Sequence, residues 1–120
     1  TNLDYIIPLP LYPDKEFKRG YNQAEVICNG IAEITQIPVL TKNVIRQRAT
    51  ETQTRKHRAE RWQNVDASYF ILKPQVLTGK NILLVDDVIT TGATLEACGQ
   101  AILKIPGTSI SLAALAHASK

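Results

Sequence analysis

The feature that most constrains this chain is an apolar run that ends in two adjacent acids and is followed by a short segment of Thr and Gly. Residues 82–85 are β-branched or Leu without alternation, which predicts a strand buried in a parallel sheet. Apolar residues then return at helical intervals over residues 93–105. A strand, a tight loop and a helix aim backbone N–H groups and the helix dipole at an anion. This segment therefore predicts a phosphate site with Asp86 and Asp87 at its rim.

Bulk composition restricts the class of protein. A length of 120 residues suits one domain, and 44% hydrophobic residues provide a core. A net charge of +3 is too small to demand nucleic acid as a partner. Cys28 and Cys98 have no second Cys or His nearby, so we expect two buried, reduced thiols and neither a zinc site nor a disulfide.

The chain carries no targeting or anchoring signal that we can identify. No run approaches the roughly 20 apolar residues that span a bilayer, and no signal peptide is visible. We therefore expect a cytoplasmic protein without a membrane partner. The chain contains no Met and enters a predicted strand almost at once, so we expect residues 1–120 to be a single domain of a longer protein.

The first part of the chain predicts a strand, a basic loop and a helix. The apolar run that begins at residue 4 stops at Pro8, and Pro and Gly punctuate residues 11–20, which we interpret as a loop carrying Lys18 and Arg19. Asn22 with Glu25 forms a capping-box pattern at the start of a helix that ends near residue 35. Its expected apolar stripe comprises Val26, Ile27, Ile31 and Ile34.

Residues 46–65 form an unusually basic, polar stretch between two short strand candidates at residues 39–45 and a strand at residues 67–72. A short helix at residues 56–63, with Trp62 turned to the core, is one reading of its second half. A basic stretch of this kind is either a solvated surface or a flexible binding loop, and long loops in small domains are often binding loops. Its cations are Arg46, Arg48, Arg55, Lys56, Arg58 and Arg61.

The alternation of strands and helices, closed by a strand at residues 109–117, predicts an α/β domain with three layers around a central, largely parallel sheet. Ligands of such sheets bind beyond the carboxyl ends of the strands. The loops at residues 10–20, 48–65 and 88–92 should meet at that edge. His117 lies near the end of the last strand, and we interpret it as a structural or surface histidine.

The two acids indicate that the ligand carries another group besides a phosphate. Backbone N–H groups and Thr hydroxyls of residues 90–94 can surround a phosphate, which Asp86 and Asp87 would repel. Carboxylates suit sugar hydroxyls or a hydrated divalent metal. A phosphorylated ribose satisfies both demands, and the basic loops favour a second charged group such as pyrophosphate.

Residues 85–94, VDDVITTGAT, resemble the phosphoribosyl pyrophosphate (PRPP) motif of type I phosphoribosyltransferases. The segments PLPL at residues 8–11 and RGYNQA at residues 19–24 are similar to the competence protein F branch, which is amidophosphoribosyltransferase-like. The basic stretch matches that branch more loosely. Together the resemblance covers most of the chain.

The resemblance implies a role for each matching position. It implies that Asp86 and Asp87 hold the ribose hydroxyls and, through water, Mg²⁺, and that these acids act in catalysis with Arg58. The residues implied for the 5′-phosphate are Thr90, Thr91, Gly92, Ala93 and Thr94. Those implied for pyrophosphate are Lys18, Arg19, Arg55 and Lys56.

The implied reaction is transfer of the 5-phosphoribosyl group from Mg-PRPP to a nitrogen acceptor, with release of pyrophosphate. The acids would stabilise an oxocarbenium-like state, and Mg²⁺ and the basic loops would stabilise the leaving group. The acceptor stays open, because Thr90 stands where family members that act on 6-oxopurines often carry an acid. The cysteine-rich region of the branch and a glutaminase domain are missing from these 120 residues.

Two other functions stay open. One is a non-catalytic sensor of PRPP or a nucleotide, since a fold does not fix a function. The other is an accessory factor in DNA uptake, in which the basic stretch would bind single-stranded DNA or a partner in the competence machinery. A homodimer is a further expectation. The alternative without a function for the acid pair is a surface turn at the end of a strand.

Overall fold

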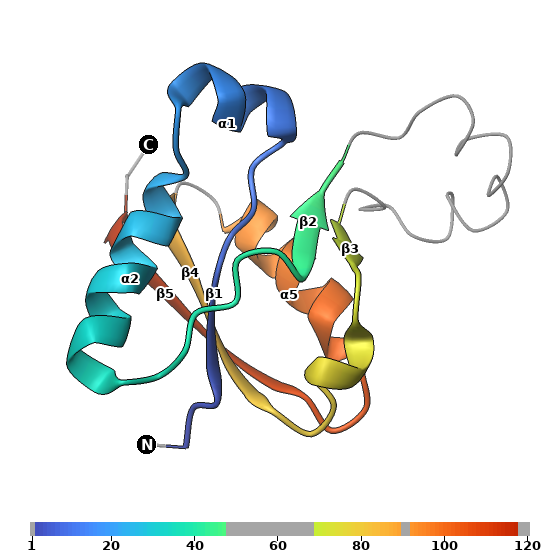
Figure 1. The fold of residues 1–120 in the computed structure, drawn as a ribbon. Coiled ribbons are helices and arrows are strands. Elements are labelled where there is room, and N and C mark those ends of the chain that lie inside the picture. The colour runs from blue at the N-terminus through green and yellow to red at the C-terminus, as the bar shows by residue number, and fades with distance from the viewer. Residues whose placement is uncertain (1, 48–68, 90–91, 118–120) are drawn as a thin grey trace, which may run out of the picture.

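The computed structural model describes residues 2–47, 69–89 and 92–117. Strands and helices are interspersed along the chain, with α1 directly followed by α2 and β2 by β3 (Figure 1). In order they are β1 (Tyr5–Pro8), α1 (Pro13–Arg19), α2 (Gln23–Thr35), β2 (Val44–Arg46), β3 (Tyr69–Ile71), a 3₁₀ turn (Pro74–Val76), β4 (Asn81–Ile89), α5 (Ala93–Leu103) and β5 (Ser109–His117).

Three parallel strands make the central sheet, in the order β1–β4–β5. The register pairs Ile7 with Leu84 on one side of β4, and Leu84 with Leu112 on the other. Val39 adds an isolated parallel bridge to Ile6 at the outer edge of β1. A separate antiparallel pair, β2–β3, lies beside α5. The predicted α/β class with a parallel sheet is thus confirmed.

The sheet is covered on both faces because adjacent strand residues point in opposite directions. Ile6 and Val85 are buried with Cys28 of α2 on one face. On the other face the buried residues come from the sheet, from β2–β3 and from α5, and they include Ile7, Leu84, Val44, Tyr69, Leu95, Cys98 and Ile102. Helices α2 and α5 therefore form the outer layers (Figure 1). Both cysteines are buried free thiols, as expected.

The prediction that residues 11–20 form only a loop is wrong, because they contain helix α1. Pro13 occupies the first turn, where its missing N–H costs nothing, and Gly20 ends the helix with a φ of 88°. The Pro and Gly that indicated a loop are therefore the start and stop signals of a short helix. Helix α1 has no buried residue, so hydrophobic periodicity could not reveal it.

The end of β4 and the apolar stripe of α2 also differ from the prediction. Strand β4 does not end before the acids but continues through them to Ile89, because β5 pairs with it as far as His117. In α2 the apolar stripe is only partly right: Ile27 and Ile31 pack on the core, whereas Val26 and Ile34 are 52% and 85% exposed. The helix itself begins and ends where predicted.

The described ranges contain no helix long and apolar enough to cross a membrane. The predicted helix at residues 56–63, Trp62, and most of the basic stretch lie outside the described residues.

Candidate functional site

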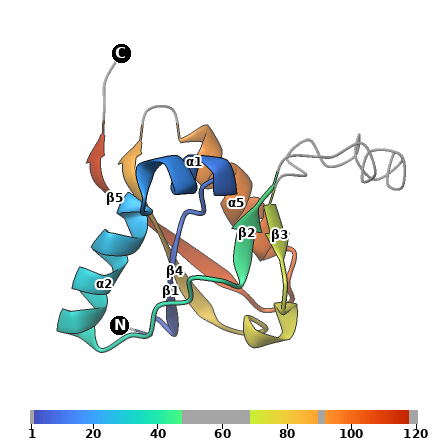
Figure 2. The same cartoon turned by 45° about the horizontal axis from the view of Figure 1, so that its top comes forward.

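The candidate site lies where the connections of the sheet diverge. Strand β1 leads to α2 on one face, and the neighbouring strand β4 leads to α5 on the other face. Such a switch point leaves a crevice beyond the carboxyl ends of the two strands, where ligands of open α/β sheets bind. Helix α1 lies beyond the same ends (Figures 1 and 2). The topology therefore indicates that a ligand binds at this edge of the molecule.

Hydrogen bonds hold the β1 wall of this crevice. The backbone N–H of Leu9 donates to the Val85 carbonyl at 2.7 Å, which continues the sheet beyond Pro8. Asn22 is only 7% exposed; its Nδ2 donates to the Leu9 carbonyl at 3.1 Å and its Oδ1 accepts from the Ala24 N–H at 2.9 Å. The predicted cap of α2 is thus confirmed, and the same side chain also fixes the chain leaving β1.

Asp86 and Asp87 lie in the last part of β4, at the crevice. Asp86 Oδ1 accepts from the Asp87 N–H and Asp87 Oδ1 accepts from the Val88 N–H, each at 2.8 Å. These bonds fix both carboxylates at the strand end, and each acid is only partly exposed. The structure therefore brings together the two acids that the sequence predicted as site residues.

Their proximity changes the acidity of one of them. Burial, and to a smaller extent the neighbouring Asp87 side chain, raise the pKa of Asp86 from its ordinary 3.8 to about 6, although the Asp87 N–H opposes the shift. A carboxylate that is costly to ionise gains from a cation nearby. The carboxylate pair therefore favours a ligand that brings a positive charge to this position.

The carboxylate pair fits a magnesium ion. Mg²⁺ prefers oxygen ligands and is commonly held by one or two carboxylates together with waters and substrate phosphates. The described residues contain no group of three or more His, Cys, Asp or Glu side chains that could hold a metal. Two carboxylates with substrate oxygens match this donor set, whereas an all-protein cage does not.

The N-terminus of α5 faces the same edge. Gly92 is the N-cap of this helix, in the left-handed region with a φ of 83°, and as a glycine it has no side chain to cap the first turn. The carbonyl of Gly92 accepts from the Glu96 N–H at 2.9 Å, and the Thr94 N–H lies in the first turn, where backbone N–H groups have no intrahelical acceptor. Gly92, Ala93 and Thr94 are therefore placed where an anion would meet the helix dipole. Thr90 and Thr91 lie outside the described residues.

The predicted basic residues divide into two groups. Lys18 and Arg19 are exposed in the last turn of α1, next to the start of α2. Arg55, Lys56 and Arg58 lie outside the described residues. The described structure thus joins the acids to the helix N-terminus, and contacts of the five cations stay predictions.

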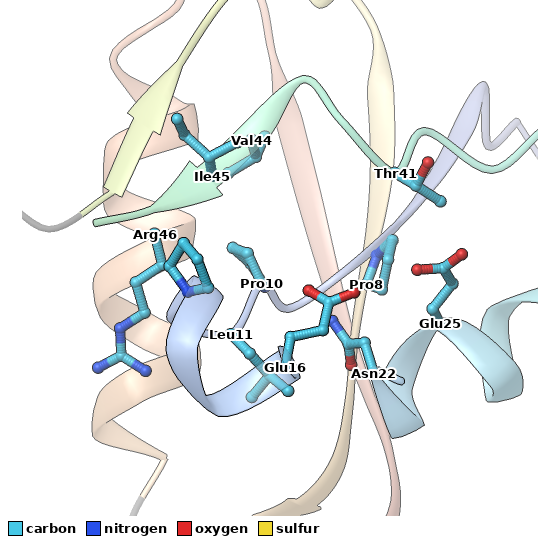
Figure 3. Close-up of a pocket in the computed structure, with 11 residues that line it drawn as sticks. Pro8, Pro10, Leu11, Glu16, Asn22, Glu25, Thr41, Val44, Ile45 and Arg46 are labelled. Carbon is cyan, nitrogen blue, oxygen red and sulfur yellow. The ribbon is translucent and has the colours of Figure 1, made fainter. Parts of the chain in front are cut away.

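A hollow on the outer side of β1 was not predicted. It has a volume of about 140 Å³ and lies between β1, α1, α2 and β2 (Figure 3). Its walls are mostly prolines and aliphatic side chains, and the carboxylates of Glu16 and Glu25 face it (Figure 3). Arg46 lines its far end, and the Arg46 guanidinium carbon lies 4.2 Å from the centre of the Tyr12 ring. Charge in the basic stretch was a signal for Arg46, but its aromatic neighbours come from distant segments.

Comparison with known proteins supplies an independent line of evidence. Residues 22–120 match the phosphoribosyl transferase domain. The chain is 34% identical to competence protein F of Haemophilus influenzae over 114 residues, which cover 94% of this chain and 50% of that protein. It is 30% identical to DNA utilization protein YhgH of Escherichia coli strain K12, covering 84% and 44%, and 31% identical to competence protein ComFC of Bacillus subtilis, covering 82% and 38%. The chain therefore spans about half or less of these curated relatives.

Proposed function

The chain belongs to the phosphoribosyl transferase domain family, and from this premise we propose that its crevice binds Mg-PRPP and transfers the 5-phosphoribosyl group to a nitrogen acceptor. The observation that carries the proposal is the joint placement of Asp86, Asp87 and the α5 N-terminus at the carboxyl end of β4. The two carboxylates suit a sugar and a cation, and the helix N-terminus suits a phosphate. A phosphorylated ribose presents these groups together.

In this proposal each wall of the crevice binds a different part of PRPP. The first turn of α5 binds the 5′-phosphate through Gly92, Ala93 and Thr94, joined by Thr90 and Thr91. Asp86 and Asp87 accept hydrogen bonds from the ribose hydroxyls and hold water around Mg²⁺. The pyrophosphate then extends towards the β1 wall, where Lys18, Arg19, Arg55 and Lys56 are the predicted contacts.

The proposed reaction is a displacement at the anomeric carbon of the ribose. The acceptor nitrogen forms a bond to this carbon, the carbon–oxygen bond to pyrophosphate breaks, and the acceptor loses a proton. Asp86 and Asp87 stabilise the positive charge that develops on the ribose, and Arg58 is the predicted cation at the leaving group. When bound, Mg²⁺ neutralises charge on the departing pyrophosphate.

Isothermal calorimetry with PRPP, with and without Mg²⁺, is the first test. We expect saturable binding that strengthens with Mg²⁺, because the carboxylate pair requires a cation between itself and the ligand. A pyrophosphate-release assay across nucleobases and small amines then identifies the acceptor. Glu33→Gln is the matched control, since this exposed acid lies near the opposite end of α2 and should leave affinity unchanged.

The result that contradicts the proposal is the absence of PRPP binding with and without Mg²⁺. Tight binding without release of pyrophosphate from any acceptor would instead favour a sensor of PRPP. The cytoplasmic location and the homodimer stay predictions that fractionation and analytical ultracentrifugation can test.

A role in DNA handling is the second candidate function. It is favoured by the names of the relatives, which include two competence proteins and a DNA utilization protein. Single-stranded DNA would bind mainly through phosphate contacts, so its affinity should fall steeply with salt. Binding of a labelled oligonucleotide that survives Asp86→Asn with Asp87→Asn would separate this function from the PRPP site.

A further inference from the structure

A second hollow lies where β2 begins and β3 ends, at the lower ends of the two strands in Figure 1. It has a volume of about 500 Å³, and none of the described residues assigned to PRPP lines it. Its lining is mostly apolar and includes the aliphatic side chains of Val39, Leu40, Leu72 and Val76. Leu72 is 59% exposed, so part of this apolar surface faces solvent. We call this hollow the lower groove.

Hydrogen bonds hold the two sides of the lower groove together. The Asn43 side chain donates through Nδ2 to the Lys73 carbonyl at 3.2 Å and accepts through Oδ1 from the Lys73 N–H at 2.7 Å. The Leu72 N–H donates to the Asn43 carbonyl at 2.8 Å. These bonds join the segment before β2 to the segment after β3, so the groove exists before any partner binds. A preformed surface loses less conformational entropy on binding than one that must first be ordered.

The lower groove also includes the outer edge of the sheet. The Ile6 N–H donates to the Pro38 carbonyl, and the Leu40 N–H donates to the Ile6 carbonyl, each at 2.9 Å. In this parallel pairing the N–H and the carbonyl of Val39 are directed away from β1. Neither group has a hydrogen-bond partner in the part of the chain that the structure describes. A strand edge with such backbone groups can pair with an extended segment of another chain.

The charge of the lower groove restricts the kind of partner. Lys42 and Lys73 line it and are exposed, and no acidic side chain of the described ranges lines it. Cations beside an apolar surface favour a partner that combines apolar with acidic side chains. Single-stranded nucleic acid binds through bases stacked on aromatic rings, and the described lining contains no aromatic residue. The groove therefore fits an acidic peptide segment better than a nucleic acid.

We propose that the lower groove binds an extended acidic segment of a partner protein as an added strand. The segment pairs with the backbone of Val39, and its apolar side chains pack against Leu40 and Leu72. Alternate side chains of an extended segment point in opposite directions, so apolar residues at every second position enter the groove. The acids between them lie near Lys42 and Lys73. This interaction is independent of the proposed binding of PRPP, because it uses other residues.

The test measures fluorescence polarisation of a labelled peptide of alternating Leu and Glu residues with the intact chain. We expect saturable binding that weakens as salt is added, because salt screens exposed ion pairs. One control peptide carries Lys in place of Glu, and a second carries an N-methyl group on every amide. The first reverses the charge, and the second cannot donate hydrogen bonds to the strand edge. We therefore expect neither control to bind at the same concentrations.

Substitutions in the lower groove should weaken peptide binding and leave the fold intact. Leu72→Asp removes an apolar contact and adds a like charge, so we expect affinity to fall about 10-fold or more. Lys42→Glu with Lys73→Glu should lower affinity roughly 10-fold and abolish the weakening by salt. Ile34→Asp is the matched control, because this α2 side chain is 85% exposed and does not line the groove. Thermal unfolding reports the stability of each variant.

The inference is supported if the Leu and Glu peptide binds and both groove variants reduce its affinity while Ile34→Asp does not. It is overturned if that peptide does not bind, if the Lys peptide binds equally well, or if Ile34→Asp causes an equal loss. A wild-type dimer that Leu72→Asp dissociates in sedimentation velocity would assign the groove to a second copy and overturn the inference. Binding of a single-stranded oligonucleotide that the same variant abolishes would also overturn it. Affinity for Mg-PRPP should be the same with and without the peptide.

Discussion

The two walls of the crevice are built in different ways. The β4 wall takes its acids and its helix N-terminus from one continuous segment, residues 86–94. The β1 wall joins Leu9 to Asn22, and beside it Arg46 contacts Tyr12 and Tyr69 from distant segments of the chain. The first wall can be recognised from neighbouring residues alone, whereas the second exists only after β2, β3 and the chain leaving β1 have packed together.

This difference predicts how each wall responds to substitution. On the β4 wall, a local change should remove one function and leave the fold in place, because the acids and the glycine are near the surface. On the other wall, hydrogen bonds and packing couple binding to the position of several segments. The predictions below test this contrast, from the largest expected effect to the smallest.

The largest effect should come from the paired variant Asp86→Asn with Asp87→Asn. Loss of both charges removes the attraction for Mg²⁺ and the strongest acceptors for the ribose hydroxyls. We expect affinity for Mg-PRPP to fall about 100-fold or more, which corresponds to roughly 3 kcal/mol. Calorimetry measures this change, and circular dichroism should show an intact fold. Unchanged affinity would refute the carboxylate assignment.

Gly92→Val tests the helix end of the β4 wall. Gly92 has a φ of 83°, a conformation that costs other residues roughly 1–2 kcal/mol. Among the described residues, the contact that a Cβ here would make is with Ile89 Cγ2 at 4.0 Å, so the strain comes from the backbone. We expect a lower Tm and about 10-fold weaker binding of ribose 5-phosphate, since a shift of about 1.4 kcal/mol gives that factor.

Gly30→Ala is the control for that variant. Gly30 lies inside α2, and a Cβ added there would meet no atom of residues 2–47, 69–89 and 92–117 within 4 Å. Alanine has the higher helix propensity, so we expect up to about 1 kcal/mol of stabilisation and unchanged phosphate affinity. Equal effects of the two variants on Tm would show that φ does not decide the role of Gly92.

The pH dependence of folding stability tests whether ionisation of Asp86 is unfavourable in the folded protein. Its pKa is raised from 3.8 to about 6 in the folded protein, so the folded state holds this proton more tightly than the unfolded state. The associated stability is therefore complete below pH 3.8 and is lost as the pH rises through about 6.

Asp86→Asn removes this dependence. We expect the variant to be more stable than the wild-type protein by roughly 1 kcal/mol at pH 7, a value reduced from the full shift because solvent screens a partly exposed group. At pH 3.5 the difference should vanish. Thermal unfolding across pH 3.5–8 measures it, and a stabilisation that is equal at all pH values would contradict the assignment.

Asn22→Ala tests the hydrogen bonds of the β1 wall, and we expect it to have the smallest effect on ligand affinity. It removes the α2 cap and the link to the Leu9 carbonyl, which together cost about 1–2 kcal/mol. Asn22→Asp keeps the cap but not the donor, so its loss should be smaller. Chemical denaturation measures both, with the exposed Asn29→Ala of α2 as a control that should change stability little.

Much of the fold and half of the candidate site could be predicted from the sequence. Hydrophobic runs placed β4 and β5, the cap at Asn22 placed α2, and the acids followed by Gly92 indicated a phosphate site with a demand for a cation. These features depend on contacts between residues that are close in sequence, so a local sequence pattern is enough to predict them. Helix α1 was missed because it buries no residue.

The tertiary structure decided what lies opposite the acids. Pairing with β5 extends β4 through Asp86 and Asp87, and the diverging connections after β1 and β4 select the edge at which the crevice opens. The position of Arg46 depends on contacts between segments far apart in sequence, which no local pattern records. The sequence by itself thus determined the phosphate and carboxylate wall, and long-range packing determined the β1 wall and the aromatic contacts of Arg46.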